Sequence, residues 1–182
     1  MIIGITGTNG SGKGEVVNIL VKYYGFTHYS IRDVLTQELK KQQREINRET
    51  LRDIANQLRK TYTNDILIRK ILTQVNSQDC IIESIRNIDE AKYIQNQNGI
   101  LIAVDAKIRI RYERIIRRHS KTDSVSFEEF QTEELSEYEN TNTSSQNLRK
   151  CIEMADIKLY NNSTIAELTT QIEKYSKLFK KQ

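Results

Sequence analysis

Glycine is concentrated near the start of this chain, and no other feature of the sequence constrains the fold as much. Of the seven glycines among 182 residues, five lie between Gly4 and Gly14, and proline is absent. Glycine is favoured where the backbone adopts a positive φ or approaches another group closely. The unusual backbone conformations of this chain are therefore predicted to lie in one short segment.

That segment matches a phosphate-binding pattern. Residues 7–13 read Gly-Thr-Asn-Gly-Ser-Gly-Lys, the first seven positions of G-x-x-x-x-G-K-[ST], between a predicted strand and a predicted helix. In this context, backbone N–H groups and the positive end of the helix dipole surround a β-phosphate. Lys13 is predicted to bridge the β- and γ-phosphate oxygens. The alternative is a glycine-rich turn followed by an exposed lysine.

The residue after Lys13 is Gly14, which lacks the hydroxyl that usually holds Mg²⁺ in this pattern. Glu15 follows, and it either helps to hold the metal or stabilises the first helical turn as an N-terminal carboxylate. The second role is favoured, because a carboxylate beside polyphosphate repels it unless a metal intervenes. The predicted nucleotide ligands are Gly7, Thr8, Asn9, Gly10, Ser11, Gly12, Lys13, Gly14 and Glu15.

Apolar runs and amphipathic segments alternate along the rest of the chain. Strands are predicted over residues 2–6, 26–30, 80–82, 100–104 and 157–160. Helices are predicted over residues 12–24, 33–44, 48–61, 65–76, 88–97, 107–119, 126–138, 148–154 and 164–180, with Asn47 and Asn64 as two of the N-caps. This alternation predicts an α/β fold, with a parallel sheet covered by helices on both faces. Ligands bind at the carboxyl ends of such strands, which here carry Gly7–Lys13, Ser30–Asp33, Glu83–Arg86 and Asp105.

Three segments resemble adenylate kinases and related nucleoside monophosphate kinases. Residues 7–14 resemble their G-x-x-G-x-G-K-G-T loop, with Glu15 in place of the threonine. Residues 80–86 resemble their strand ending in Asp-Gly-Phe-Pro-Arg, one residue shorter, and residues 112–118 resemble their Asp-Arg-Ile-x-x-Arg segment. The tail from residue 154 to residue 164 is more similar to dephospho-CoA kinases and the P-loop proteins like them.

The resemblance implies a three-layer P-loop NTPase fold with a five-stranded parallel sheet, in a single domain over residues 1–182. Residues 31–64 would form an acceptor-binding helical region, and residues 119–147 a lid. The implied reaction moves the γ-phosphoryl group of ATP, bound with Mg²⁺, onto a nucleoside or deoxynucleoside monophosphate. Two alternatives stay open: an enzyme like dephospho-CoA kinase that phosphorylates a ribose hydroxyl, and a nucleotide-binding regulatory protein with little catalysis.

By the same resemblance, Lys13, Arg86 and Arg118 are the predicted catalytic residues, and Arg114 would stack on the donor base. Arg111, Arg114 and Arg118 share one flank of the helix predicted over residues 107–119. Positive charge along such a flank suits a phosphoryl-transfer transition state. The alternative is a charged surface helix that pairs with the acidic stretch over residues 128–139.

The acceptor side is less regular in sequence. Arg86 is the predicted acceptor-phosphate ligand, because a guanidinium group binds phosphate bidentately, although a surface arginine is the alternative. Glu83 occupies a position from which a carboxylate holds Mg²⁺ through water, and the alternative is a capping or salt-bridged glutamate. Asp33 either orients metal-bound water or an acceptor hydroxyl, or caps the helix that follows it.

Ser30 and Arg32 complete the predicted acceptor site. Adenylate kinases have an arginine three positions after the residue that matches Asp33, where this chain has Thr36. Arg32 is the candidate for the missing charge. In the rival reading as a dephospho-CoA kinase, Asp33 would be the carboxylate base.

Composition narrows the classes of partner. The net charge of +4 suits an anionic substrate, and the aromatic and basic surface pattern of a nucleic-acid-binding module is lacking. Cys80 and Cys151 are predicted to be reduced thiols of a cytoplasmic protein. Neither a signal peptide nor a membrane-spanning run is predicted, and His28 and His119 are given no catalytic role. The expected partner is a small nucleotide substrate, with no nucleic acid and no membrane, and the chain is expected to be a monomer or homodimer.

Overall fold

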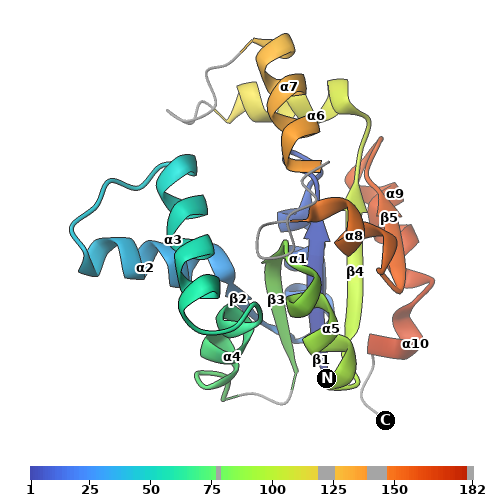
Figure 1. Cartoon of the computed structure of the whole chain (residues 1–182). Coiled ribbons are helices and arrows are strands. Elements are labelled where there is room, and N and C mark those ends of the chain that lie inside the picture. Colours follow the sequence, from blue (N-terminus) through green and yellow to red (C-terminus); the bar gives the residue numbers. More distant parts are fainter. Residues whose placement is uncertain (77–78, 119–125, 139–146, 180–182) are drawn as a thin grey trace.

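Five parallel strands form the centre of the molecule (Figure 1). The computed structural model describes residues 1–76, 79–118, 126–138 and 147–179. The strand order is β2-β3-β1-β4-β5. The strands are β1 (Ile2–Gly7), β2 (Thr27–Ser30), β3 (Cys80–Ile85), β4 (Ile100–Asp105) and β5 (Ile157–Tyr160). This arrangement confirms the predicted α/β fold and its five-stranded sheet.

Alternate residues of the buried strands point to two apolar clusters, one on each face of the sheet. Ile3, Ile81 and Ile102 belong to the cluster under α1 (Lys13–Tyr24), α9 (Ile165–Glu173) and α10 (Ser176–Phe179). Ile82 and Leu101 belong to the cluster on the opposite face. The helices there are α2 (Ile31–Lys41), α3 (Arg48–Thr61), α4 (Ile66–Leu72), α5 (Ile88–Asn96) and α8 (Leu148–Glu153). Helices therefore cover both faces, as a three-layer fold requires.

Helices α6 (Ile108–Arg117) and α7 (Phe127–Tyr138) form an arm above the carboxyl ends of the strands (Figure 1). The ring of Tyr112 on α6 packs against Phe127 and Phe130 on α7, with ring centroids 5.3 and 5.7 Å apart. Phe130 is fully buried. These aromatic contacts hold α7 against α6, where Glu134 on α7 pairs with Arg111 on α6. Most of the rest of the predicted lid, over residues 119–147, lies outside the described residues.

Several predicted boundaries were wrong for local reasons. Helix α2 begins at Ile31 rather than residue 33, because the Ser30 side chain caps it by accepting a hydrogen bond from the Arg32 N–H at 3.2 Å. Asp33 therefore lies in the first turn of α2, and its predicted alternative role as a cap is wrong. Asn64 does not cap α4; its side-chain amide donates to the Asp89 carboxylate at 2.7 Å.

Strand β3 continues beyond the predicted residue 82 to Ile85, so Glu83 lies within the strand rather than at its end. Ser84 adopts a φ of 77°, and the pairing of β1 with β3 shifts register between Ile5 and Thr6. The Thr6 hydroxyl donates to the Ile85 carbonyl at 2.8 Å and so closes the irregular end of this pair. This bulge sets the direction in which the chain leaves β3 toward Arg86.

Candidate active site

The phosphate loop has three positions that only glycine fills without strain. Gly7, Gly10 and Gly12 have φ values of 141°, 76° and 93°. A Cβ atom at these positions would lie 2.0 Å from the Val104 carbonyl oxygen, 2.5 Å from the Arg111 carbonyl oxygen and 2.1 Å from Asn161 Nδ2, respectively. The loop is therefore fixed by its own dihedral angles and by close neighbours from distant segments.

Gly14 is different, because nothing lies within 4 Å of the Cβ atom that it lacks. The backbone does not require glycine there. Packing therefore does not explain why this position lacks the usual hydroxyl group; the absence changes only the chemistry that the loop offers to a metal.

Lys13 begins α1 and folds back over the loop. Its ammonium group donates to the carbonyl oxygens of Gly7 at 3.1 Å and Thr8 at 2.9 Å. Burial lowers the pKa of Lys13 to about 8, helped by the positive charges of Arg86 and Arg118 and opposed by Glu83 and Glu134. Four charged side chains, from β3 and the turn after it, from the end of α6 and from α7, therefore act electrostatically on Lys13 in the phosphate loop.

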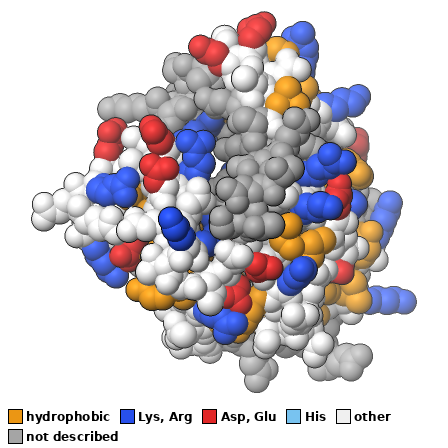
Figure 2. All heavy atoms as spheres, in the orientation of Figure 1, with side chains coloured by type: hydrophobic (Ala, Val, Ile, Leu, Met, Phe, Trp, Pro, Cys, Tyr) orange, Lys and Arg blue, Asp and Glu red, His pale blue; other side chains and the backbone are white. Residues whose placement is uncertain are grey.

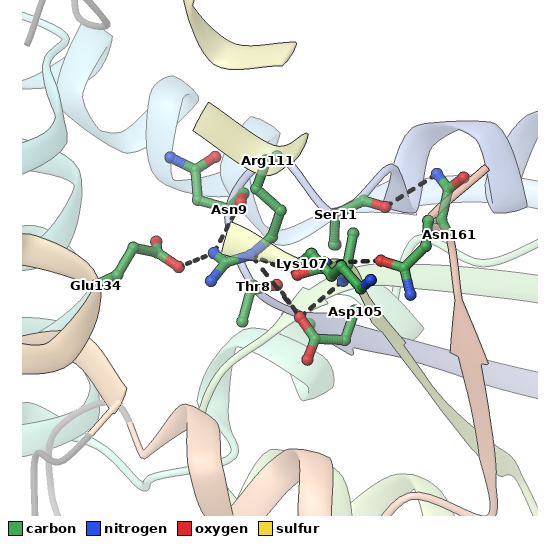
Figure 3. Close-up of polar contacts among 12 residues, drawn as sticks. Thr8, Asn9, Ser11, Asp105, Lys107, Arg111, Glu134 and Asn161 are labelled. Carbon is green, nitrogen blue, oxygen red and sulfur yellow. Dashed lines mark hydrogen bonds and ion pairs between the residues drawn. The ribbon is translucent and has the colours of Figure 1, made fainter. Parts of the chain in front are cut away.

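One network supports the loop from the side of β4. Thr8 Oγ1 donates to Asp105 Oδ1 at 2.7 Å, and the Ala106 N–H donates to the same oxygen at 2.8 Å. Arg111 is 7% exposed, and its guanidinium donates to the carbonyl oxygens of Ala106 at 2.9 Å and Asn9 at 3.2 Å. Figure 3 shows this guanidinium between the loop and Glu134, with which it forms an ion pair. Arg111 therefore joins the phosphate loop to α7.

A second network supports the loop from the side of β5. Asn161 follows β5 and is 6% exposed; its side-chain amide donates to the Ser11 carbonyl at 3.0 Å. Its carbonyl oxygen accepts from Arg114 Nη2 at 3.3 Å. Arg114 is thereby held beside the loop, and the charge of Glu15 also acts on it. Sequence reasoning missed Asn161, although its place directly after the fifth predicted strand was a usable signal.

The three-arginine flank predicted on α6 is present. Arg111 and Arg114 contact the loop, while Arg118 is exposed and acts on the charge of Lys13. The predicted alternative, pairing with the acidic stretch, also holds for Arg111 because of its contact with Glu134. The functional roles of these residues stay predictions.

Glu83 faces the site from β3. Its carboxylate lies 3.4 Å from Nε2 of His28 on the neighbouring strand β2. Burial opposes ionisation of Glu83, but the hydrogen bond from His28 and the charge of Lys13 outweigh it and keep the pKa below its usual value. Glu83 is therefore ionised at neutral pH, as a carboxylate near a metal must be. His28, for which no catalytic role was predicted, is the partner of Glu83 in the structure.

Of the predicted acceptor residues, Arg86 acts on the phosphate loop, whereas the others lie at the start of α2. Arg86 follows β3, and its charge acts on Lys13. The Arg86 N–H donates to Glu90 Oε2 at 3.2 Å, and the Asn87 N–H donates to the same oxygen at 3.2 Å. Ser30 is the α2 cap, while Arg32 and Asp33 are exposed in the first turn of α2. Their contact with an acceptor stays a prediction.

At the carboxyl ends of the strands, the described residues offer polar groups to a nucleotide but few ligands to Mg²⁺. Ser11 Oγ is buried and has no hydrogen-bond partner among the described residues, so a polar group in the loop is left for a ligand. No three His, Cys, Asp or Glu side chains gather into a metal site within residues 1–76, 79–118, 126–138 and 147–179. Mg²⁺ is commonly held by one or two carboxylates plus substrate phosphates, and Glu83 supplies one such carboxylate.

Sequence comparisons place the chain among P-loop proteins. A family model described as AAA domain matches residues 6–131. A UPF0200 protein of Sulfurisphaera tokodaii is 31% identical, with 97% of this chain and 96% of that protein covered. A UPF0200 protein of Thermococcus sibiricus is 27% identical, with 96% and 93% covered.

Solved structures with the same fold are P-loop kinases and a protein of unstated activity. TT1252 from Thermus thermophilus has a TM-score of 0.65 at 17% identity, covering 98% of this chain and 96% of its own. Shikimate kinase from Aquifex aeolicus has a TM-score of 0.59 at 16% identity, covering 97% and 96%. A gluconokinase from Sinorhizobium meliloti has a TM-score of 0.55 at 13% identity, covering 97% and 91%. No helix in the described part of the chain is long and apolar enough to cross a membrane.

Proposed function

The chain belongs to the family of UPF0200 proteins, with an AAA domain over residues 6–131, and we propose that it transfers the γ-phosphoryl group of ATP to a nucleoside monophosphate. Its P-loop kinase-like fold indicates nucleotide-dependent phosphoryl transfer. The choice of acceptor is the finer part of the proposal. This choice rests on the acceptor-side residues, because similarity of fold to other kinases does not identify the acceptor of this chain.

One observation carries the proposal. Arg86, from the acceptor side, and Arg118, from the arm, both act on the charge of Lys13 in the phosphate loop. Donor and acceptor phosphates held by these three cations would therefore meet at one place. Phosphoryl transfer depends mainly on such positioning and on compensation of negative charge.

The donor triphosphate would replace the internal contacts of the loop. Lys13 would exchange its two carbonyl partners for phosphate oxygens, and the backbone N–H groups of the loop would bind the β-phosphate. Arg114 would contact the donor base from its place beside Asn161. When bound, Mg²⁺ neutralises charge on the β- and γ-phosphates, and Glu83 is the residue that would hold it through water.

The acceptor phosphate would lie on Arg86. A nucleoside monophosphate is already anionic at neutral pH, so its attacking oxygen carries no proton that a base must remove. The chain then needs only to bind, align and exclude water. Closure of the arm over the phosphates would reduce transfer to water.

A second acceptor class is favoured by a specific observation. The solved structures of similar fold include shikimate kinase and a gluconokinase, which are small-molecule kinases and not nucleotide kinases by name. Transfer to a hydroxyl group, including the ribose hydroxyl of dephospho-CoA, requires a nearby carboxylate base. Asp33, exposed at the start of α2, is the candidate.

The test is ADP formation from Mg·ATP with a panel of ribo- and deoxynucleoside monophosphates, dephospho-CoA, shikimate and gluconate. Turnover with one monophosphate, abolished in Lys13→Met, is the expected result. Turnover with only a hydroxyl acceptor would replace the proposal with the second class. ATP binding without acceptor-dependent turnover would leave a nucleotide-binding regulatory protein.

A further inference from the structure

Two polar atoms on α3 have no hydrogen-bond partner among the described residues although they are buried. They are Nη1 of Arg59 and Oδ1 of Asn56. The residues are three positions apart and therefore lie on the same face of the helix. A buried polar group left unpaired destabilises a protein, so two such atoms on one helix face indicate a missing partner.

The other two nitrogens of the Arg59 guanidinium each donate a hydrogen bond. Arg59 Nε and Nη2 donate to Glu90 Oε1 at 3.1 and 2.7 Å, and both side chains are essentially inaccessible to solvent. The other Glu90 oxygen accepts from the N–H groups of Arg86 and Asn87. The ion pair thus connects α3 to the turn that carries Arg86, and it fixes the direction of the remaining nitrogen, Nη1.

This place in the molecule is rich in positive charge. Burial and the charge of Glu90 raise the pKa of the Cys151 thiol on α8, and the charges of Arg59 and Arg86 oppose them, so both guanidinium groups lie within electrostatic range of this thiol. Arg48 and Arg52 precede Asn56 and Arg59 along the same face of α3. Figure 2 shows basic and acidic side chains side by side on this part of the surface.

We propose that Arg59 and Asn56 bind the acceptor: Arg59 Nη1 donates to an anionic oxygen, and Asn56 Oδ1 accepts from an N–H or O–H group of the same molecule. This inference rests on the proposed function and narrows its substrate class to phosphorylated molecules that also carry a hydrogen-bond donor. Nucleoside monophosphates carry both groups. Because neither atom contacts solvent, the acceptor reaches them only when α3 shifts.

The experiment compares Arg59→Lys and Asn56→Leu with two matched controls. Arg59→Lys keeps the charge opposite Glu90 and removes the planar fork, while Asn56→Leu keeps the volume and removes the carbonyl. Arg69→Lys alters an exposed arginine paired with Asp65, and Gln57→Leu alters an exposed neighbour of Asn56 on the same helix. The readouts are KM for acceptor, KM for ATP, kcat and thermal stability.

Both test variants should raise the acceptor KM by about tenfold or more, the effect of losing one hydrogen bond to a charged or buried partner. The ATP KM should stay within about twofold, and both controls should resemble the wild type. Asn56→Leu should also unfold at a higher temperature without acceptor, because it removes an unpaired buried carbonyl. An unchanged acceptor KM in Asn56→Leu, or in a folded Arg59→Lys, would overturn the proposal and leave an internal water as the partner.

Calorimetric titration of the ATP-free protein with the panel of monophosphates separates this inference from the proposed function. Binding that is weakened in Asn56→Leu, with no turnover, would support the acceptor site while the kinase reading fails. If a monophosphate is turned over and neither variant weakens its binding, the kinase function is supported and the acceptor site at Arg59 and Asn56 is overturned. No binding of any monophosphate would overturn the site as well.

Discussion

The proposed donor and acceptor sides of this molecule are built in different ways. The donor side is a continuous backbone loop, shaped by the positive φ values of Gly7, Gly10 and Gly12. The acceptor side depends on side chains that meet across the fold, above all Arg59 and Glu90, which are 31 positions apart. The difference teaches that a local backbone motif shapes the phosphate loop, while the proposed acceptor side depends on tertiary packing.

The strongest test of the donor side is Lys13→Met. Loss of the ammonium group should reduce phosphoryl transfer by roughly 10³-fold or more, because no other residue of the loop supplies a charge to the transferring group. Burial already disfavours charge on Lys13, so the variant should unfold at the same temperature as wild type or higher. ADP formation and thermal melts measure the two effects.

The control for that variant is Lys22→Met, in the last turn of the same helix, where the side chain is exposed. It should keep full activity. If Lys13→Met retained more than about one-tenth of wild-type activity, the loop would not bind the donor triphosphate as proposed.

The strongest test of the acceptor side is Glu90→Ala. It leaves the Arg59 guanidinium buried without its carboxylate and removes the partner of two backbone N–H groups. The free energy of unfolding should fall by about 3–5 kcal/mol, the usual effect of breaking a buried ion pair. Urea denaturation of the variant and the wild type measures this difference.

Asp65→Ala provides the matched control, because the Asp65–Arg69 pair lies on the surface and Arg69 is 51% exposed. Its effect should not exceed about 1 kcal/mol. Equal losses in the two variants would mean that the acceptor side is not organised around the buried pair.

A third test uses the pKa of Lys13, which burial lowers to about 8. Phosphate oxygens favour the charged form, so nucleotide binding raises this pKa. Below pH 8, Lys13 is charged in both states and affinity is greatest; above pH 8, the free protein loses the proton and binding must restore it. The dissociation constant for ATP should therefore rise by up to about tenfold per pH unit above pH 8.

Calorimetry from about pH 7 to about pH 9.5 covers this range and lies above the titration of the phosphate itself, near pH 6. The same titration with Lys13→Met should show no such slope. A slope that persists in the variant would assign the proton to another group.

The sequence placed the phosphate-loop motif between a strand and a helix because its pattern is local, and the ligand roles of its residues stay predictions. Five strands and the order of helices followed from apolar periodicity, and the α3 bounds of 48–61 agree with the structure. The supports of the loop did not follow: Asn161 meets Ser11 across 150 positions, and no short pattern encodes that contact. The Arg59–Glu90 pair was missed for the same reason, since each residue taken alone is typical of a solvated helix face.

The apolar pattern of the sequence also did not predict where β3 ends. Glu83 and Ser84 interrupt an apolar run and predict the end of a strand, but pairing with β1 and β2 carries the strand on to Ile85. Tertiary hydrogen bonding overrode the local preference. Acceptor-side geometry therefore depended on a strand end that the sequence placed incorrectly.

The smallest expected effect concerns the one loop position where glycine is not required. Gly14→Ser adds a hydroxyl at a site with nothing within 4 Å of its Cβ, so the fold should tolerate it. The added oxygen restores the usual metal ligand of the pattern and should lower the Mg²⁺ concentration for half-maximal activity by about twofold to tenfold, the value of one added polar contact. Gly14→Ala is the control, with the same steric change and no hydroxyl. If both variants shift the Mg²⁺ dependence equally, the metal does not approach this position, and the carboxylate of Glu83 becomes the more important protein contact to test.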